Sequence, residues 1–456
     1  MYLEGIEHIL DLLSQHERTA RRVLNMVPSE NSMSALAKLP MLLDVYHRYF
    51  FNTSLSADEW NFRGSQDVAE LETHYTARLL RELTGAEYVN LRPLSGLSGT
   101  AMVLSALGGP QGSKVLTVSP DQGGHYATSS LARRLGLTTC FITGPNPHTI
   151  DYEGIAATIQ EHRPGLIYID QSNCLFPINV ENLVAAARSV APEILIHVDV
   201  SHWMGLVLGE VFPNPLAVGA DSFGGSMHKT FPGPQKAIVV TNRKDLWERI
   251  YQAQYEMISS HHFAATISLG IALEEFKECG GRQYAARLVQ NTKALGDHLH
   301  QLGLKVEASD RNFSCGHQLW IRTSHRNVDA YTAGDRLYQA GIRVNAFPEL
   351  PGIPERVIRI GVNEATFHGL QLNDMRELAE IFVAAVLGQQ DIKQLAECVA
   401  ALRARYFQPF CFPSSDPRLL SQVLSVVRQA MAPDDFVAIE EGVAIPAAAR
   451  QRVSSR

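Results

Sequence analysis

The spacing of hydrophobic residues along the chain predicts where its first helices lie. Apolar side chains that recur every three to four positions mark residues 6–26 as an amphipathic helix. The residues on its apolar face are Ile6, Ile9, Leu10, Leu13 and Val23. The same spacing recurs over residues 68–84, and Gly85 then supplies a stop signal. Two helices are therefore expected before the central part of the chain.

Short runs of nearly continuous apolar and β-branched residues follow, up to about residue 245. They are VLTV (115–118), TTCFIT (138–143), LIYID (166–170), ILIHVDV (194–200) and AIVVT (237–241). Strands that are buried on both faces have such sequences, as in a parallel sheet covered by helices. The segments between the runs, such as 127–136 and 182–190, are long enough for crossover helices. The pattern predicts an α/β domain.

The second half of the chain has a different organisation. A long helical pattern covers residues 264–303, and strands then mix with helices over about 305–385, which indicates a smaller α+β domain. The chain from 386 onward has helical periodicity and ends in a polar segment. The expected divisions are an N-terminal helical arm (1–30), a large domain (31–280), a small domain (281–390) and a helical C-terminal extension (391–456).

Composition excludes several classes of protein. Of 456 residues, 45% are hydrophobic and 19% are charged, which is enough apolar material for a large folded core. The net charge of −7 and the lack of a basic cluster argue against binding to nucleic acid or to anionic membranes. Six cysteines without a CxxC pair indicate reduced thiols and no metal site. With no signal-peptide pattern and no apolar run near the roughly 18 residues of a spanning helix, we expect a cytoplasmic protein.

The polar residues that follow the predicted strands are the candidates for a functional site. Ligands of parallel α/β sheets bind outside the carboxyl ends of the strands, which makes these positions informative. They include His125, Ser172, Asp199, His202, Ser226, His228 and Lys229. Upstream, Ser95 and Gly96 precede a predicted helix whose free amides would suit a phosphate.

Lys229 lies in the loop GGSMHKTFPGPQKA (224–237), where glycine and proline oppose a helix and hold the chain in a defined path. Its neighbours His228 and Thr230 can orient it. Taken singly, each candidate has an ordinary structural explanation, such as capping for Asp199 or packing for His125. Together, an amine, a carboxylate, a histidine on a glycine turn and a phosphate cradle fit pyridoxal 5'-phosphate (PLP). Its aldehyde forms a Schiff base with lysine and its ring nitrogen pairs with a carboxylate.

Six motifs in a fixed order resemble those of the serine hydroxymethyltransferase family. They are Ser-Glu-Asn (29–31), Ser-Gly (95–96), Gly-Gly-His (123–125), Asp-x-x-His (199–202), His-Lys-Thr (228–230) and Arg-Ile-Gly (359–361). The resemblance covers roughly residues 20–385. It implies a fold-type I PLP-dependent transferase, with a large domain on a mostly parallel seven-stranded sheet and a smaller α+β domain. Fold-type I sites are built at a dimer interface, so the resemblance also implies a homodimer.

The same resemblance implies a role for each matching residue. Lys229 would be the Schiff-base lysine, Asp199 would face the ring nitrogen, and His125 would stack on the ring. The remaining implied roles are Ser95 and Gly96 at the phosphate, Ser172 and His202 near the phenolic oxygen, and Arg359 with Ser29 on the substrate carboxylate. An arginine suits that last role because its planar guanidinium binds a carboxylate through two hydrogen bonds.

The chain departs from the hydroxymethyltransferase pattern at positions that matter for folate chemistry. Phe51 stands where that family has the glutamate of its folate-dependent step. The segments 228–236, 170–172 and 123–127 instead resemble the L-threonine transaldolases. This second resemblance implies retro-aldol cleavage of L-threonine to acetaldehyde and a glycyl quinonoid. Aldol addition to an acceptor aldehyde then gives a β-hydroxy-α-amino acid.

Several alternatives stay open at this point. One is a serine or α-methylserine hydroxymethyltransferase, another a threonine or phenylserine aldolase, and a third a PLP-free relative that only binds a partner. His125 and Tyr49 are both candidates for moving the proton of the threonine hydroxyl. The aromatic residues Phe50, Phe51, Trp60 and Phe62 would suit a flat acceptor aldehyde, or would simply pack together.

Overall fold

The computed structural model describes residues 2–49, 62–347, 349–405 and 417–431. Its largest element is a seven-stranded sheet in the order β2-β8-β7-β6-β5-β3-β4. The strands are β2 (Tyr88–Asn90), β3 (Lys114–Val118), β4 (Thr138–Ile142), β5 (Leu166–Asp170), β6 (Leu195–Asp199), β7 (Ser222–Ser226) and β8 (Ala237–Thr241). Only β8 within this sheet runs antiparallel to its neighbours. The predicted α/β fold with a mostly parallel sheet is confirmed.

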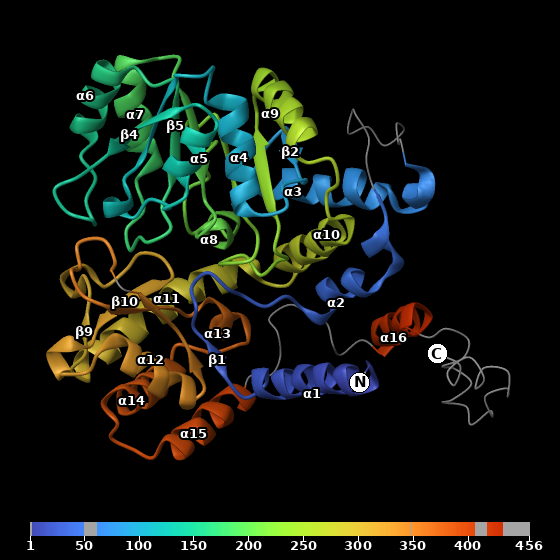
Figure 1. The fold of residues 1–456 in the computed structure, drawn as a ribbon, viewed down its shortest axis with the longest axis vertical. Helices are drawn as coiled ribbons and strands as arrows, with labels where there is room; N and C mark the ends of the chain where they lie inside the picture. The colour runs from blue at the N-terminus through green and yellow to red at the C-terminus, as the bar shows by residue number, and fades with distance from the viewer. Residues whose placement is uncertain (1, 50–61, 348, 406–416, 432–456) are drawn as a thin grey trace.

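Helices cover both faces of this sheet (Figure 1). They are α4 (Gly96–Leu107), α5 (Thr128–Arg134), α6 (Tyr152–His162), α7 (Val180–Val190), α8 (Met204–Leu208) and α9 (Lys244–Met257). Successive side chains of a strand point to opposite faces, so Val115 packs in the cluster beneath α4 and α9 while Leu116 joins the cluster that includes α6 and α7. Burial on both faces explains the continuous apolar runs of these strands.

A second, four-stranded antiparallel sheet lies below the first in Figure 1, in the order β12-β13-β10-β9. Its strands are β9 (Lys305–Val306), β10 (Gln318–Arg322), β12 (Asn345–Phe347) and β13 (Val357–Gly361). The helices of this half of the chain are α10 (Phe263–Glu278), α11 (Gly281–Gln301), α12 (Ala330–Gln339), α13 (Asn363–Phe367), α14 (Asp374–Leu387), α15 (Ile392–Arg405) and α16 (Pro417–Met431). Of these, α10 and α16 pack chiefly against N-terminal elements.

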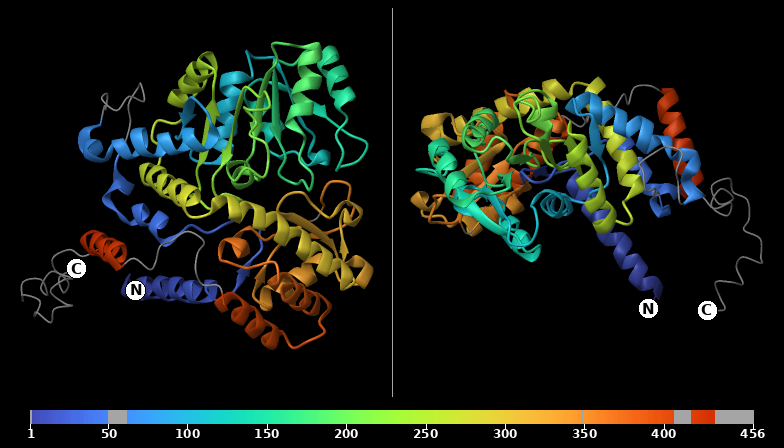
Figure 2. Two further views of the ribbon diagram at one scale, coloured as in Figure 1. Left: turned by 180° about the vertical axis from the view of Figure 1, so that it is seen from behind. Right: turned by 90° about the horizontal axis from the view of Figure 1, so that it is seen from above.

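The N-terminal helix differs from its prediction. Helix α1 (Tyr2–Ala20) ends six residues early, because strand β1 (Leu24–Asn25) pairs in parallel with β11 (Ile342–Arg343) and buries Leu24. Figures 1 and 2 show α1 extending away from the rest of the chain, and Ile6, Ile9, Leu10 and Leu13 of its predicted face are exposed. The described part of the same chain therefore leaves much of this hydrophobic stripe uncovered.

The predicted helix over 68–84 forms in three parts. A 3₁₀ segment (Arg63–Val68) leads into a π-helical turn (Leu71–Thr76), and α3 (Ala77–Thr84) follows. Gly85 ends α3 in the left-handed conformation at φ 64°, as predicted. The shorter elements between α1 and this helix are α2 (Ala35–Lys38) and 3₁₀ turns at Leu39–Leu42 and Asp44–His47. Further 3₁₀ turns are Pro120–Gln122, Ser309–Arg311 and Ser324–Arg326.

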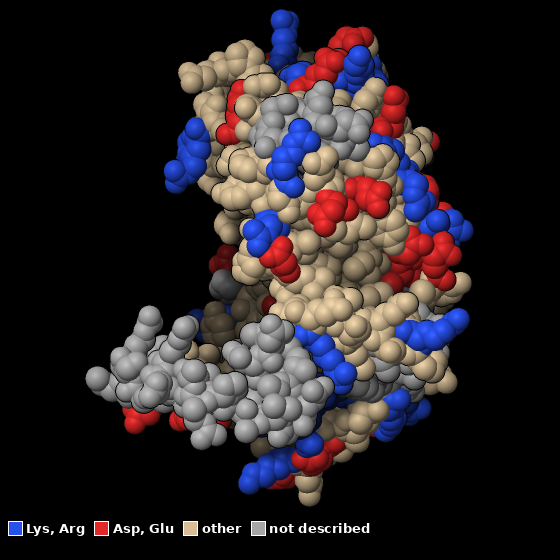
Figure 3. All heavy atoms as spheres, turned by 90° about the vertical axis from the view of Figure 1, so that its right-hand side faces the viewer, with Lys and Arg blue, Asp and Glu red and all other residues tan. Residues whose placement is uncertain are grey.

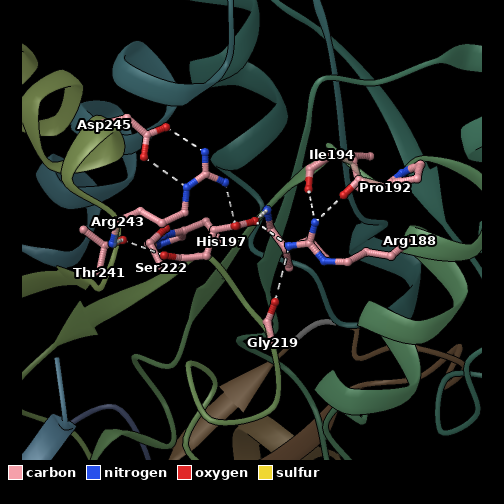
Figure 4. Close-up of polar contacts among 11 residues, drawn as sticks. Arg188, Pro192, Ile194, His197, Gly219, Ser222, Thr241, Arg243 and Asp245 are labelled. Atoms are coloured by element: carbon pink, nitrogen blue, oxygen red, sulfur yellow. Dashed lines mark hydrogen bonds and ion pairs between the residues drawn. The ribbon is translucent and has the colours of Figure 1, made fainter. Parts of the chain in front are cut away.

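A hydrogen-bonded network ties together the amino ends of β6 and β7 (Figure 4). Asp221 Oδ2 accepts from Arg188 Nη2 at 3.0 Å and from the Ile196 amide at 2.8 Å, while Oδ1 accepts from Arg243 Nη1 at 2.9 Å. Arg188 also donates to the carbonyl of Pro192 at 2.7 Å. The network joins α7, the central strands and the start of α9 at one edge of the sheet, which leaves the opposite, carboxyl edge for a site.

The surface carries both signs of charge. On the face shown in Figure 3, lysine and arginine side chains are interspersed with aspartate and glutamate. None of the helices in the described ranges has the length and apolar character needed to cross a lipid bilayer.

Candidate active site

A cleft opens at the carboxyl ends of β5, β6 and β7, where the sequence placed its candidates. Predicted residues that line it are Ser95, Gly96, His125, Ser172, Asp199, His202, Ser226, His228 and Lys229. Leu97, Thr100, Asp170, Gln171 and Ser201 complete the lining. They come from loops up to 134 residues apart in sequence, and the parallel strand order brings them to one place.

Asp199 ends β6 and is held on both carboxylate oxygens. The backbone amide of Ser201 donates to Oδ1 at 2.7 Å, and the Tyr168 hydroxyl lies 3.3 Å from Oδ2. The neighbouring Gly225 has φ 133°, and a Cβ there would lie 2.7 Å from Asp199 Oδ1. Glycine at this position therefore lets β7 approach the carboxylate, and Asp199 is fixed in orientation.

Lys229 lies in the cleft on a loop whose backbone is anchored from three directions. Its carbonyl accepts from Asn31 Nδ2 at 2.7 Å and from Asn363 Nδ2 at 3.4 Å. Thr230 Oγ1 accepts from the amide of Gly205 at 3.0 Å, so the threonine ties the loop to α8. Burial lowers the pKa of Lys229 to about 8, an effect that Asp199 opposes and Arg359 reinforces. The neutral, nucleophilic amine is therefore more populated near neutral pH than in an ordinary lysine, although the protonated form still predominates.

The start of α4 is where the sequence predicts a phosphate cradle. Ser95 caps the helix by accepting from the Ser98 amide, and Ser98 reciprocates by accepting from the Ser95 amide. A Cβ at Gly96 would come within 2.4 Å of Ser226 Oγ, so any side chain would fill the space in front of the helix. A positive helix end facing a gap that only glycine leaves open fits the phosphate of PLP.

His125 lies on the turn that follows β3. Its Nδ1 accepts from the amide of Ala127 at 3.2 Å, and its ring stacks on Tyr126 at 4.7 Å between centroids. Burial and the nearby Lys229 lower its pKa, while Asp199 raises it. The neutral ring with Nδ1 engaged as an acceptor carries its proton on Nε2. The turn therefore holds His125 at the cleft as a neutral imidazole whose Nε2–H is available as a hydrogen-bond donor.

Arg359 lies on β13 of the small sheet and reaches the large domain. It donates to the side-chain oxygens of Asn173 and of Asn345, the latter at 3.2 Å, and its guanidinium lies 4.5 Å from the ring centre of Phe347. Burial lowers the pKa of Arg359 to about 10, so it stays charged at neutral pH. The guanidinium is positioned by neutral amides and an aromatic ring. These partners do not neutralise its positive charge, so it can bind an anionic ligand.

Three predicted substrate residues are not part of the cleft lining in a single chain. Arg359 lies next to it, with Nη1 3.4 Å from the carbonyl oxygen of Ser172. Ser29 is half-buried beside Pro28, whose carbonyl lies 3.2 Å from His317 Nε2. Tyr49 is 54% exposed and stacks on Phe62 at 5.0 Å. Their roles stay predictions. Phe50, Phe51 and Trp60 lie outside the described residues, so the position of the missing folate glutamate is not described either.

The structure adds residues that sequence reasoning did not select. Asp170 ends β5 in register with Asp199, accepts from the Thr128 hydroxyl, and has a pKa raised well above its usual value, mainly by burial. The sequence feature that could have identified Asp170 is the Asp-Gln-Ser motif at 170–172. Gln318 and His317 contact His202 from the other sheet. Nothing in the local sequence could have placed those two, because the contact spans more than 110 residues.

Comparison with known proteins matches this geometry to one family. The family model described as serine hydroxymethyltransferase matches residues 4–382. An L-threonine:uridine-5'-aldehyde transaldolase of a Streptomyces species is 39% identical over 412 residues, covering 90% of this chain and 98% of the relative. A fluorothreonine transaldolase of Streptantibioticus cattleyicolor is 31% identical, covering 87% of this chain and 62% of the relative.

A solved structure agrees in fold over nearly the full length. The crystal structure of an L-threonine transaldolase from Pseudomonas fluorescens, in its internal aldimine state, superposes with a TM-score of 0.82 at 26% identity. The match covers 94% of this chain and 97% of that one. The chain therefore belongs to the serine hydroxymethyltransferase family, as its six motifs predicted.

Proposed function

We propose that this protein is a PLP-dependent L-threonine transaldolase. It would cleave L-threonine between Cα and Cβ, release acetaldehyde, and transfer the glycine unit to an acceptor aldehyde to give a β-hydroxy-α-amino acid. The observation that carries this proposal is the cleft that joins Lys229, Asp199 and the Gly96 cradle, in a chain 39% identical to a transaldolase. When bound, PLP supplies an electron sink for the bonds at Cα of the amino acid.

The chain's own residues would hold the cofactor at three points. Lys229 would bind its aldehyde, Asp199 would face its ring nitrogen, and the amides at the start of α4 would receive its phosphate. Ser226 and His228 lie around these points. Ser201 and Gly225 already fix the orientation of the Asp199 side chain, so the carboxylate would not have to move to face the ring nitrogen of the cofactor.

Substrate orientation would depend on Arg359, with Ser29 beside it. The guanidinium would pair with the threonine carboxylate through two parallel hydrogen bonds, which fixes the rotation about Cα. That rotation determines which bond of Cα stands across the ring, and thereby selects Cα–Cβ cleavage over other outcomes. Asn173 and Asn345 already hold Arg359 toward the cleft.

The proton of the threonine hydroxyl needs a partner. Because Nδ1 of His125 accepts from the Ala127 amide, its neutral ring would carry the proton on Nε2, which would make it a donor and a poor acceptor for that proton. The other candidate for moving the hydroxyl proton is Tyr49, which would have to come from a second copy of the chain.

Uridine-5'-aldehyde is the first acceptor to test, because it is named for a relative at 39% identity, above the 31% of the fluorothreonine transaldolase. A residue next to the cleft supports a flat acceptor. Tyr126 is 80% exposed and stacks on His125, which lines the cleft, so the tyrosine ring offers an exposed aromatic surface beside it. Aromatic faces bind flat heterocycles by stacking.

The proposal is tested by supplying L-threonine without folate and measuring acetaldehyde with a coupled dehydrogenase. We expect slow release from threonine alone and faster release when uridine-5'-aldehyde is added, together with a new β-hydroxy-α-amino acid detected by mass spectrometry. Rapid release without any acceptor, yielding free glycine, would identify an aldolase. Turnover of L-serine or α-methylserine only with tetrahydrofolate would identify a hydroxymethyltransferase and contradict the proposal.

We also propose that the working unit is a homodimer with shared sites. Tyr49 is exposed and outside the cleft of its own chain, and the apolar stripe of α1 is uncovered, including Leu10 at 58% and Leu13 at 57% exposure. A second copy that covers this stripe would gain hydrophobic stabilisation and could carry Tyr49 to the neighbouring cleft.

Complementation between inactive variants tests the shared site. Lys229→Met and Tyr49→Phe should each lose most activity alone, and their co-expressed mixture should recover about a quarter of it, since hybrid dimers carry one intact site. The matched control co-expresses Lys229→Met with Asp199→Asn. Those residues line the same cleft of one chain, so no hybrid site is intact. Equal recovery in both mixtures, or full activity of Tyr49→Phe alone, would contradict the shared site.

We also propose a cytoplasmic location, and a small domain that covers residues 281–390. Within the described part of the chain Cys140, Cys174, Cys315 and Cys398 are free thiols, which suits a reducing compartment. The strands of the small antiparallel sheet, from β9 at Lys305 to β13 at Gly361, support a small domain within this range.

A further inference from the structure

Gln318 is a fully buried amide that lies directly behind His202. It belongs to β10 of the small sheet, whereas His202 follows β6 of the large one. Its Nε2 lies 3.0 Å from the carbonyl oxygen of Ser172 and 3.3 Å from His202 Nδ1. Its Oε1 lies 3.4 Å from Trp320 Nε1. One side chain therefore joins two residues of the cleft to the opposite domain.

The partners of Gln318 leave one orientation for its amide. An indole N–H can only donate, so the atom that faces Trp320 must be the oxygen. A carbonyl can only accept, so the atom that faces Ser172 must be the NH₂ group. The same NH₂ group faces His202 Nδ1, which must then be the unprotonated, accepting nitrogen of the imidazole.

His317 leads independently to the same assignment. Its Nε2 lies 3.2 Å from the carbonyl oxygen of Pro28, so this nitrogen carries a proton. It also lies 3.3 Å from His202 Nδ1, with the two rings stacked at 5.4 Å. Burial lowers the pKa of His202 well below its usual value, helped by Lys229, and lowers that of His317 to about 3. Both rings are neutral, and the proton of His202 sits on Nε2.

We infer that Gln318 is a positioning residue that, with His317, holds His202 in the Nε2–H tautomer, so that His202 presents a hydrogen-bond donor to the cleft and cannot act there as a base. The inference deepens the proposed function and rests on it for its catalytic consequence. A donor fixed at this point stabilises a negatively charged oxygen without rearrangement. The phenolic oxygen of bound PLP is an acceptor of that kind.

The tautomer is measured directly by nitrogen NMR on PLP-loaded protein with ¹⁵N-labelled histidine, assigned by loss of the signal in His202→Asn. In the wild type we expect His202 to show protonated Nε2 and bare Nδ1. Gln318→Glu places an acceptor where the donor was, and should move the proton to Nδ1 or charge the ring. His197, whose ring nitrogen lies 2.8 Å from Ser222 Oγ in Figure 4, is the internal reference and should not change. A wild-type His202 protonated on Nδ1 would overturn the inference.

A pair of variants separates positioning from packing. Gln318→Met keeps the shape and removes one of the two donors to Nδ1, so the fraction of His202 in the Nε2–H tautomer should fall only partly, since His317 remains, and kcat should fall less than about 10-fold. Gln318→Glu has nearly the same size and should lower kcat about 10²-fold with little change in the KM for L-threonine. Equal losses in both variants would mean that Gln318 only packs. If the expected tautomers appear but L-threonine is not cleaved, the proposed function fails while the inference stands.

Discussion

Replacing Lys229 with methionine is expected to lower acetaldehyde release from L-threonine by at least about 10³-fold. The variant keeps the length of the side chain in the cleft but removes the amine that would bind the cofactor's aldehyde. The pKa of Lys229, lowered to about 8 by burial, means that the neutral amine is available at lower pH than for an ordinary lysine. Cofactor loading of the apoprotein should therefore rise with pH and level off above about pH 8.

Covalent capture identifies the lysine independently of activity. Borohydride treatment of the loaded wild type should fix the cofactor on one tryptic peptide, which mass spectrometry locates. Lys236 is the built-in control, because it is also buried and has its pKa lowered to about 7, yet it lies outside the cleft lining. Label on Lys236, or undiminished turnover by Lys229→Met, would contradict the assignment.

Replacing Arg359 with lysine is expected to raise the KM for L-threonine about 100-fold and to lower kcat/KM by at least as much. Lysine keeps the positive charge but loses the planar pair of N–H donors that matches a carboxylate. It also loses the contacts to Asn173 and Asn345 that aim the guanidinium. Because the carboxylate fixes the rotation about Cα, we expect side products from other bonds at Cα to increase as well.

Arg356→Lys is the matched control for this prediction. Arg356 directly precedes the same strand, and its side chain is 54% exposed in a surface pair with Asp329. A surface ion pair contributes little, so stability and kinetics should stay close to those of the wild type. The measurement is steady-state kinetics of both variants with L-threonine. An unchanged KM in Arg359→Lys would contradict a role for Arg359 in binding the substrate.

Four of the strands that the sequence located correctly share one property. Residues 115–118, 166–170, 194–200 and 237–241 are nearly continuous apolar runs because helices bury both faces of the sheet. Strand β7 (Ser222–Ser226) has no apolar run in its sequence SFGGS, and the sequence indicates it only through the polar residues that follow it. Its glycines are required by packing, since a Cβ at Gly224 would lie 2.3 Å from the Ile238 carbonyl. Local hydrophobicity cannot predict a strand in which close packing against neighbouring strands requires glycine.

The N-terminal helix shows the opposite error. Its apolar spacing continues to Val23, and periodicity alone extends the helix to residue 26. In the structure the chain leaves the helix at Ala20, because the amide of Leu24 donates to the carbonyl of Gly341 at 2.9 Å and begins a strand pair. A partner more than 300 residues away overrides the local preference.

The sequence by itself determined the class of chemistry. An amine, a carboxylate and a histidine follow strands whose carboxyl ends meet at one edge of a parallel sheet, and Ser95 with Gly96 opens a helix. That reasoning placed Lys229, Asp199, His125 and Ser95 in one cleft without any knowledge of distances. Only the tertiary structure decided how these groups are held. The proton position on His202 and the direction of Arg359 depend on Gln318, Asn173 and Asn345, which meet them across the two sheets. Hydrogen bonds act over about 3 Å, so such partners become visible only once the chain is folded.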